Sequence, residues 1–99
     1  MTKIETRAFD VADHLASPEE VATYLQVALE ESGEDSLLFR AALADALKAQ
    51  QRMSAAAREA GISRQGAYKA LSEEGNPSFD TVWKLLRAAG LTLEIKAAA

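Results

Sequence analysis

Apolar residues recur at helical spacing in five stretches of this 99-residue chain, and each stretch follows a residue that can start a helix. The first is introduced by Ser17-Pro18-Glu19-Glu20. Ser17 is a candidate N-cap, Pro18 suits the first helical position, and Glu20 completes a capping box. We therefore predict a helix that starts at Pro18 and is ended by Gly33.

Two further helices are expected in the middle of the chain. Asp35 can cap the first of them, which runs to about Gln51. Ser54 is the candidate cap of the second, a short helix that ends near Ala60.

The last two predicted helices follow serine residues as well. The fourth covers residues 63–72, and its first residue is the cap. Ser78 caps the fifth, and Gly90 stops it. Phe79 and Trp83 lie one turn apart on the apolar face of the fifth helix, and we expect them to anchor the core. The alternative places Trp83 at a dimer contact.

Residues 91–96 alternate between apolar and polar, which is the pattern of a half-buried β-strand. A lone strand is not stable in water, so it needs a partner: the N-terminal arm, a second copy of the chain, or a bound protein. We favour an isologous homodimer, and the alternative is pairing with the arm of the same chain. The candidate dimer contacts are the apolar positions Leu91, Leu93 and Ile95.

The chain is therefore expected to be mainly α-helical, with five helices and a short C-terminal β-strand. A hydrophobic content of 48% is that of a folded protein, and 99 residues suit one small domain. We divide the chain into an N-terminal arm (residues 1–16), one domain (17–96) and a tail (97–99).

Residues 53–71 are the most informative part of the sequence, because they read as two short helices joined by a tight turn. Ala57 is small enough for the helices to approach closely, and Gly61 can take the positive φ that ends the first helix. This is the layout of a DNA-reading helix-turn-helix. The alternative is a helical hairpin with a solvated charged face. The candidate DNA-binding residues are Ser54, Ser63, Arg64, Gln65, Tyr68 and Lys69.

These side chains differ in the contacts that we expect of them. Arg64 can bond to guanine and Gln65 to adenine, each through two hydrogen bonds. Lys69 is expected at a phosphate, and Tyr68 at a phosphate or a thymine methyl group. Ser54 and Ser63 start helices, where hydroxyl and backbone N–H groups can meet phosphates.

The charge distribution supports this interpretation although the net charge is −4. Residues 1–35 carry nine acidic and two basic residues, whereas residues 48–71 carry five basic and one acidic residue. The basic part coincides with the predicted helix-turn-helix, where phosphate contacts are needed.

Other classes of protein are disfavoured. The chain has no cysteine and one histidine, His14, so we expect no metal site and no cofactor. The carboxylates of Asp10 and Asp13 lie in an arm that does not preorganise them, so we do not expect an enzyme. No apolar run is long enough to span a membrane, and no signal peptide is evident, so the expected location is the cytoplasm.

The run from Gly61 to Ser72, followed by Gly75-Asn76-Pro77-Ser78-Phe79, resembles the addiction-module antidote proteins. These are small Xre-type helix-turn-helix antitoxins related to HigA. A Phe-Asp motif before an acidic helix, here Phe9-Asp10, is a further similarity, and the resemblance spans roughly residues 9–96.

The resemblance implies a five-helix lambda-repressor-like (Xre) domain and the antitoxin half of a type II toxin–antitoxin pair. Such proteins neutralise a small RelE/ParE-like toxin and repress their own operon as dimers. The implied partners are double-stranded operator DNA, a cognate small basic toxin and a second copy of the chain. An acidic surface would attract such a toxin. The candidate toxin contacts are Phe9, Asp10, Leu15, Glu19, Glu20 and Tyr24, and the alternative for each is a solvated position.

Two other functions stay open at this point. The chain could be a stand-alone prophage-type repressor without a toxin, or a protein-interaction module that has lost DNA binding. The basic cluster at residues 48–71 argues against the second of these.

Overall fold

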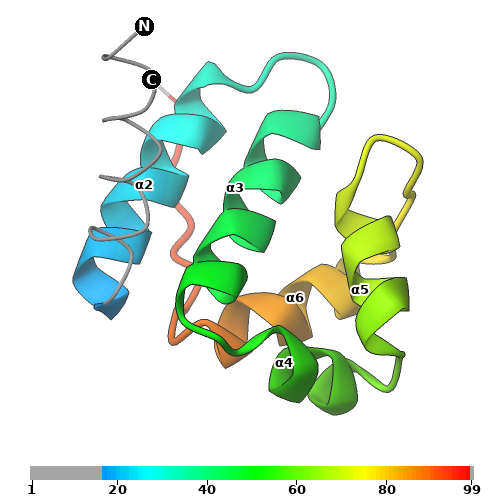
Figure 1. Cartoon of the computed structure of the whole chain (residues 1–99). Coiled ribbons are helices and arrows are strands. Elements are labelled where there is room, and N and C mark those ends of the chain that lie inside the picture. The colour runs from blue at the N-terminus through cyan, green and yellow to red at the C-terminus, as the bar shows by residue number, and fades with distance from the viewer. Residues whose placement is uncertain (1–16, 99) are drawn as a thin grey trace, which may run out of the picture.

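The computed structural model describes residues 17–98 and begins with helix α2 (Pro18–Glu31) (Figure 1). The predicted capping box is confirmed: Ser17 Oγ accepts from the Glu20 backbone at 3.2 Å, and Glu20 accepts from the Ser17 backbone at 3.3 Å. The predicted end at Gly33 is wrong. The helix stops at Glu31, because Ser32 leaves the helical conformation and its hydroxyl donates to the carbonyl of Ala28.

Helices α3 (Leu37–Ala49) and α4 (Met53–Ala60) follow. The prediction that Ser54 caps α4 is wrong, because the N-cap is Arg52 and it makes no side-chain capping bond. Gln51 has a positive φ of 58° and turns the chain sharply, while Met53 is already buried in the core. The helix therefore starts two residues earlier than predicted, and Ser54 lies in its first turn.

Helices α5 (Arg64–Leu71) and α6 (Phe79–Ala88) complete the described elements. Both predicted serine caps are confirmed: Ser63 Oγ accepts from the Gly66 backbone at 2.8 Å, and Ser78 Oγ accepts from the Thr81 backbone at 3.1 Å.

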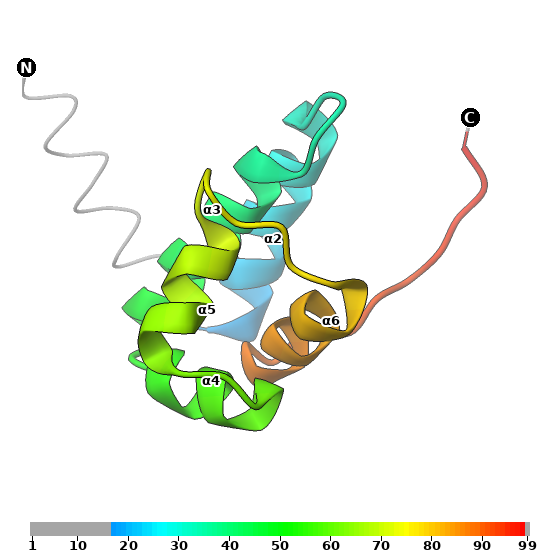
Figure 2. The ribbon, with the colours of Figure 1, turned by 90° about the vertical axis from the view of Figure 1, so that its right-hand side faces the viewer.

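The helices pack around a core of leucine and alanine side chains. α3 lies between α2 and α5, and α4 packs against α3, α5 and α6 (Figures 1 and 2). Small residues let these helices approach closely, and the large side chains fill the space between them. The largest fully buried side chains are Leu43, Leu47, Leu71, Leu85 and Val21.

The expectation that Phe79 and Trp83 anchor the core is wrong. Their side chains are 67% and 39% exposed. α6 turns a different side toward the other helices, so the aromatic pair remains on the outer surface. The buried residues at this end of the chain are Leu85, Leu86, Ala88 and Ala89.

The predicted C-terminal strand is also absent from the described residues. Residues 91–98 carry no strand and run outward from the helices (Figure 2). A strand is defined by hydrogen bonds to a neighbouring strand, and the described part of this single chain offers none. Leu91 packs against the core, whereas Leu93 and Ile95 are 45% and 95% exposed.

Arg40 is a buried cation that joins α3 to the end of α5. Its Nη1 donates to the carbonyls of Ala70 at 3.1 Å and Ser72 at 2.6 Å, and more weakly to Gly75, while Nε donates to Ser36. These carbonyls lie at the negative end of the α5 dipole, which favours a cation. The position of α5 therefore depends on a residue of α3.

We expect Arg40→Met to lower the free energy of unfolding by about 2–4 kcal/mol, because the carbonyls lose a charged donor within the protein. Urea unfolding followed by circular dichroism measures this change. Arg58→Met is the control, since Arg58 is exposed on α4, and it should cost less than about 0.5 kcal/mol. Equal losses in both variants would contradict the role of Arg40.

Candidate nucleic-acid interface

The candidate interface is built on α4 and α5, which are joined by residues 61–63. Gly61 has a φ of 76°, and the N–H of Ile62 donates to the carbonyl of Ala57 at 2.9 Å, which closes the end of α4. Ala57 is buried and lies in the core. The predicted roles of Gly61 and Ala57 in the turn are therefore confirmed.

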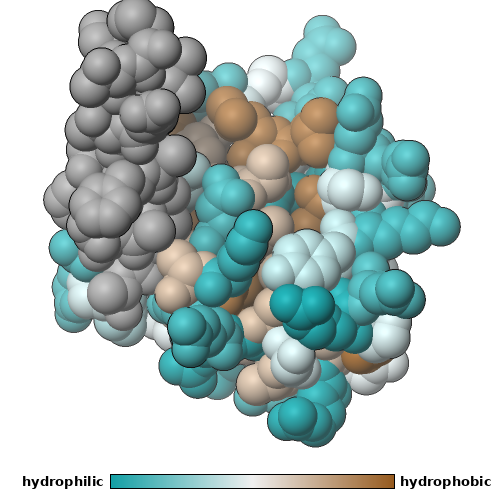
Figure 3. Space-filling model, in the orientation of Figure 1, coloured by the Kyte–Doolittle hydropathy of each residue, from teal (hydrophilic) through white to brown (hydrophobic). Residues whose placement is uncertain are grey.

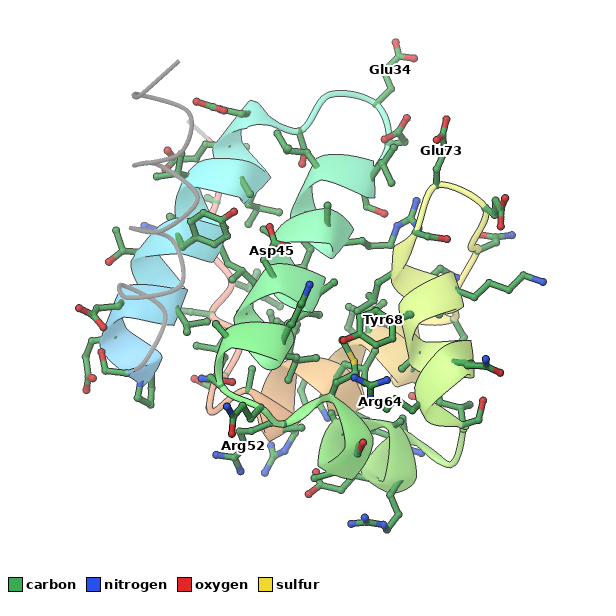
Figure 4. All side chains as sticks on the ribbon, viewed as in Figure 1. Glu34, Asp45, Arg52, Arg64, Tyr68 and Glu73 are labelled. Atoms are coloured by element: carbon green, nitrogen blue, oxygen red, sulfur yellow. The ribbon has the colours of Figure 1, made fainter. Side chains whose placement is uncertain are left out.

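α5 and its cap present polar side chains to solvent. Ser63 caps the helix, and Arg64, Gln65 and Lys69 are exposed. The Arg64 guanidinium lies over the Tyr68 ring, 5.0 Å from its centroid, and Nη2 of Arg64 is 3.4 Å from the Tyr68 hydroxyl (Figure 4). This stacking restricts the Arg64 side chain.

A recess of about 210 Å³ opens between α5 and the turn that joins α3 to α4. Figure 4 shows Arg64 and Tyr68 directed toward this region from α5. Its lining contains two cations, two hydroxyl groups and an amide, and no acidic side chain. The lining residues are Lys48, Gln51, Met53, Ser54, Arg64 and Tyr68.

The start of α4 adds backbone donors to the recess. The first N–H groups of a helix have no partner within it, and α4 has no side-chain cap. Unpartnered N–H groups and the positive end of the helix dipole favour an anion such as phosphate. The recess therefore has the chemistry of a phosphate site.

The structure brings three of the six predicted DNA-binding residues together at the recess: Ser54, Arg64 and Tyr68. Ser63, Gln65 and Lys69 lie outside it, at exposed positions of α5 or its cap. In Figure 3 the surface over α4 and α5 is largely hydrophilic.

Lys48 and Gln51 line the recess but were not among the predicted site residues. The sequence indicated Lys48 only as a member of the basic cluster at residues 48–71. Arg52 belongs to the same cluster and is exposed in the α3–α4 turn, where its side chain points away from Arg64 and Tyr68 (Figure 4). Gln51 reaches the recess through a positive φ that its residue type does not signal.

The predicted toxin-binding residues lie elsewhere. Phe9, Asp10 and Leu15 fall outside the described residues. Glu19 is exposed on α2, whereas Glu20 takes part in the capping box. α2 and α5 lie on opposite sides of α3 (Figure 1).

Tyr24 has a contact within the chain. Its hydroxyl donates to Asp45 Oδ2 at 3.1 Å and so joins α2 to α3. Burial, and then the charge and hydrogen bond of Asp45, raise the pKa of Tyr24 above its ordinary value of 10.0. The phenol is therefore a neutral donor at neutral pH.

Residues 17–98 contain no group of three or more His, Cys, Asp or Glu side chains that could hold a metal ion. Within the same residues no helix is long and apolar enough to cross a membrane.

The turn between α4 and α5 can be tested with two glycine substitutions. Neither Gly61 nor Gly33 has a neighbour within 4 Å of an added Cβ, but only Gly61 has a positive φ. We therefore expect Gly61→Ala to lower the free energy of unfolding by about 1–2 kcal/mol in a urea titration. Gly33→Ala should change it by less than about 0.5 kcal/mol. A Gly61→Ala protein as stable as the parent would contradict the need for the left-handed turn.

Comparison with known proteins identifies the family to which the chain is related. The model of a family described as probable addiction module antidote protein matches residues 5–97. An uncharacterized protein of Haemophilus influenzae is 46% identical over 92 residues, which cover 93% of this chain and 92% of that protein. No solved structure matches.

Proposed function

Because the chain belongs to the family of probable addiction module antidote proteins, we propose that it is the antitoxin of a type II toxin–antitoxin module. In this role it neutralises a small basic RelE/ParE-like toxin and, as a homodimer in the cytoplasm, represses its own operon. It performs no catalysis. The observation that carries the DNA-binding part is the recess beside α5, which gathers cations on a chain of net charge −4.

In this function the N-terminal end of α5 enters the major groove, and its exposed side chains contact base edges. Arg64 contacts guanine and Gln65 contacts adenine, because each presents two hydrogen-bonding atoms to the base. Tyr68 assists by holding the Arg64 guanidinium over its ring, 5.0 Å from the centroid, so less side-chain freedom is lost on binding.

The recess positions the protein on the DNA backbone. Lys48, Ser54 and the free N–H groups of α4 surround the place for a phosphate. Ser63 and Lys69 supply further phosphate contacts from the cap and the outer side of α5. Such contacts set register and affinity but carry no sequence information.

The toxin is proposed to bind the acidic side of the molecule. Residues 17–39 contain no lysine or arginine. A basic toxin is attracted to this side while the recess remains available to DNA. Glu19 and Tyr24 from α2 contribute to this surface, together with Phe9, Asp10 and Leu15 of the arm. The acidic residues of the segment are Glu19, Glu20, Glu30, Glu31, Glu34 and Asp35.

The DNA-binding assignment predicts two distinct responses in operator binding. Arg64→Ala with Gln65→Ala should lower operator affinity by about 10- to 100-fold and remove the preference over unrelated DNA, because base contacts are lost. Lys48→Ala should weaken binding to all sequences and reduce the slope of log affinity against log salt by about one. Fluorescence anisotropy with the upstream region of the gene measures both.

Gln26→Ala is the control for these variants, because Gln26 is exposed on α2 and lies outside the recess. It should leave operator affinity unchanged. A double variant of Arg64 and Gln65 that stays folded and still prefers the operator would refute the assignment.

The antitoxin assignment predicts a complex with the product of a small basic reading frame beside this gene. Glu19 and Glu30 are eleven residues apart and so share a face of α2. Glu19→Gln with Glu30→Gln should slow association with that protein about tenfold at low salt, because electrostatic attraction weakens. Surface plasmon resonance after co-expression and separation of the two proteins measures the rate.

Glu73→Gln with Glu74→Gln is the matched control, since these exposed carboxylates lie in the loop after α5. Association unaffected by either pair would place the toxin contact elsewhere. Absence of a complex would favour the stand-alone repressor.

A further inference from the structure

The outer side of α6 carries an aromatic pair that the DNA-binding site does not use. Phe79 and Trp83 are 67% and 39% exposed, and their ring centroids are 5.9 Å apart. Buried apolar area is the main source of association energy, and large exposed apolar patches mark interaction sites. We therefore expect a partner to cover this pair of exposed rings.

The C-terminal segment extends the same apolar surface. Trp83 and Leu86 of α6 line a shallow cleft of about 80 Å³ together with Leu91 and Leu93. Ile95 is 95% exposed and lies two residues further along the segment. Alternate residues of an extended chain share a face, so Leu91, Leu93 and Ile95 point to one side.

The direction in which the segment leaves α6 is set by local contacts. Gly90 has a φ of 90°, and a Cβ at this position would lie 3.4 Å from Pro18 of α2. The N–H of Leu91 donates to the carbonyl of Leu86 at 3.1 Å. The segment therefore starts from a fixed point on the domain.

We propose that Phe79, Trp83 and residues 91–95 form the homodimer interface, in which the segments of two copies pair antiparallel with Leu93 at the two-fold axis. This inference rests on the dimer in the proposed function and names its surface. The charged side chains around the patch are of both signs. A surface that pairs with a second copy of itself requires both signs, whereas a surface that attracts a basic toxin does not. These charged side chains are Asp80, Lys84, Arg87, Glu94 and Lys96.

The register follows from the side chains. With Leu93 opposite its own copy, Leu91 lies opposite Ile95, and all six apolar residues share one face. A shift by one residue would place these apolar residues opposite polar ones. Centring on Glu94 would still set Leu93 opposite Ile95, but it would leave Leu91 opposite Ala97 and set two Glu94 carboxylates against each other, which is unfavourable.

The area is sufficient for a dimer. The exposed parts of Phe79, Trp83, Leu93 and Ile95 amount to roughly 400–500 Å² per copy, if such side chains present about 150–250 Å² each. A stable interface buries about 800 Å² per partner, of which somewhat more than half is apolar. The patch with its charged rim reaches this size.

Cross-linking tests the register, because the chain has no cysteine of its own. Under mild oxidation Leu93→Cys should form a covalent dimer, since opposite residues near the axis are about 4.5–5.5 Å apart. Ile95→Cys is the matched control: its two copies would be about 13 Å apart, too far for a disulfide. Cross-linking of Ile95→Cys but not Leu93→Cys, or of neither, would overturn the register.

Sedimentation equilibrium on the full chain tests the surface. Phe79→Ser with Trp83→Ser should raise the dimer dissociation constant at least about tenfold, because the loss of a buried aromatic contact is typically of that size or larger. Circular dichroism checks that this variant remains folded, as expected for exposed positions. A dimer of unchanged strength, or a parent chain that is monomeric at high concentration, would overturn the proposal.

The outcome is separable from that of the proposed function. A parent chain that binds operator and toxin but fails to cross-link through Leu93→Cys refutes this interface alone. A chain that cross-links as expected but binds neither partner refutes the proposed function and supports the interface.

Discussion

A buried guanidinium holds α5 in place. Arg40 of α3 donates to carbonyls at the end of α5 and in the loop toward α6. These acceptors are neutral, so the charge is balanced by several partial charges that converge on it. The loop approaches α5 so closely that a Cβ on Gly75 would overlap the carbonyls of Lys69 and Ala70. The recess, the exposed face of α5 and the start of α6 all depend on this contact.

The molecule separates its charges along the chain and in space. The segment from residue 17 to residue 39 is acidic, whereas the turn before α4 and the first turn of α5 are basic. α3 lies between these two parts, so DNA and an attracted basic protein would meet different sides (Figure 1). Net charge therefore says little about the partners of this chain, because each partner responds to the field near its own surface.

Residue types near the helix ends predicted most of the helices. The features that the sequence did not predict depend on tertiary contacts. The caps Ser17, Ser63 and Ser78 depend on bonds within four residues, so their residue types suffice. Phe79 and Trp83 have core-like spacing, but which side of α6 faces the core depends on where α3 and α4 lie. Arg40 could not be foreseen either, since its acceptors are thirty or more residues away. The alternation of apolar and polar residues over 91–96 predicted a strand, but the described part of a single chain contains no second strand to pair with it.

The uncapped start of α4 has a consequence for the lifetime of the protein. The side chains of Ser17, Ser63 and Ser78 each accept a hydrogen bond from a backbone N–H group in the first turn of their helices. The first N–H groups of α4 have no such side-chain acceptor. On the proposed function a DNA phosphate acts as the missing cap, so the operator completes a part of the fold. A ligand that binds only the native state stabilises it in proportion to its occupancy. Antitoxin molecules seated on the operator would then resist unfolding and proteolysis longer than the free pool, and repression would outlast a fall in antitoxin supply.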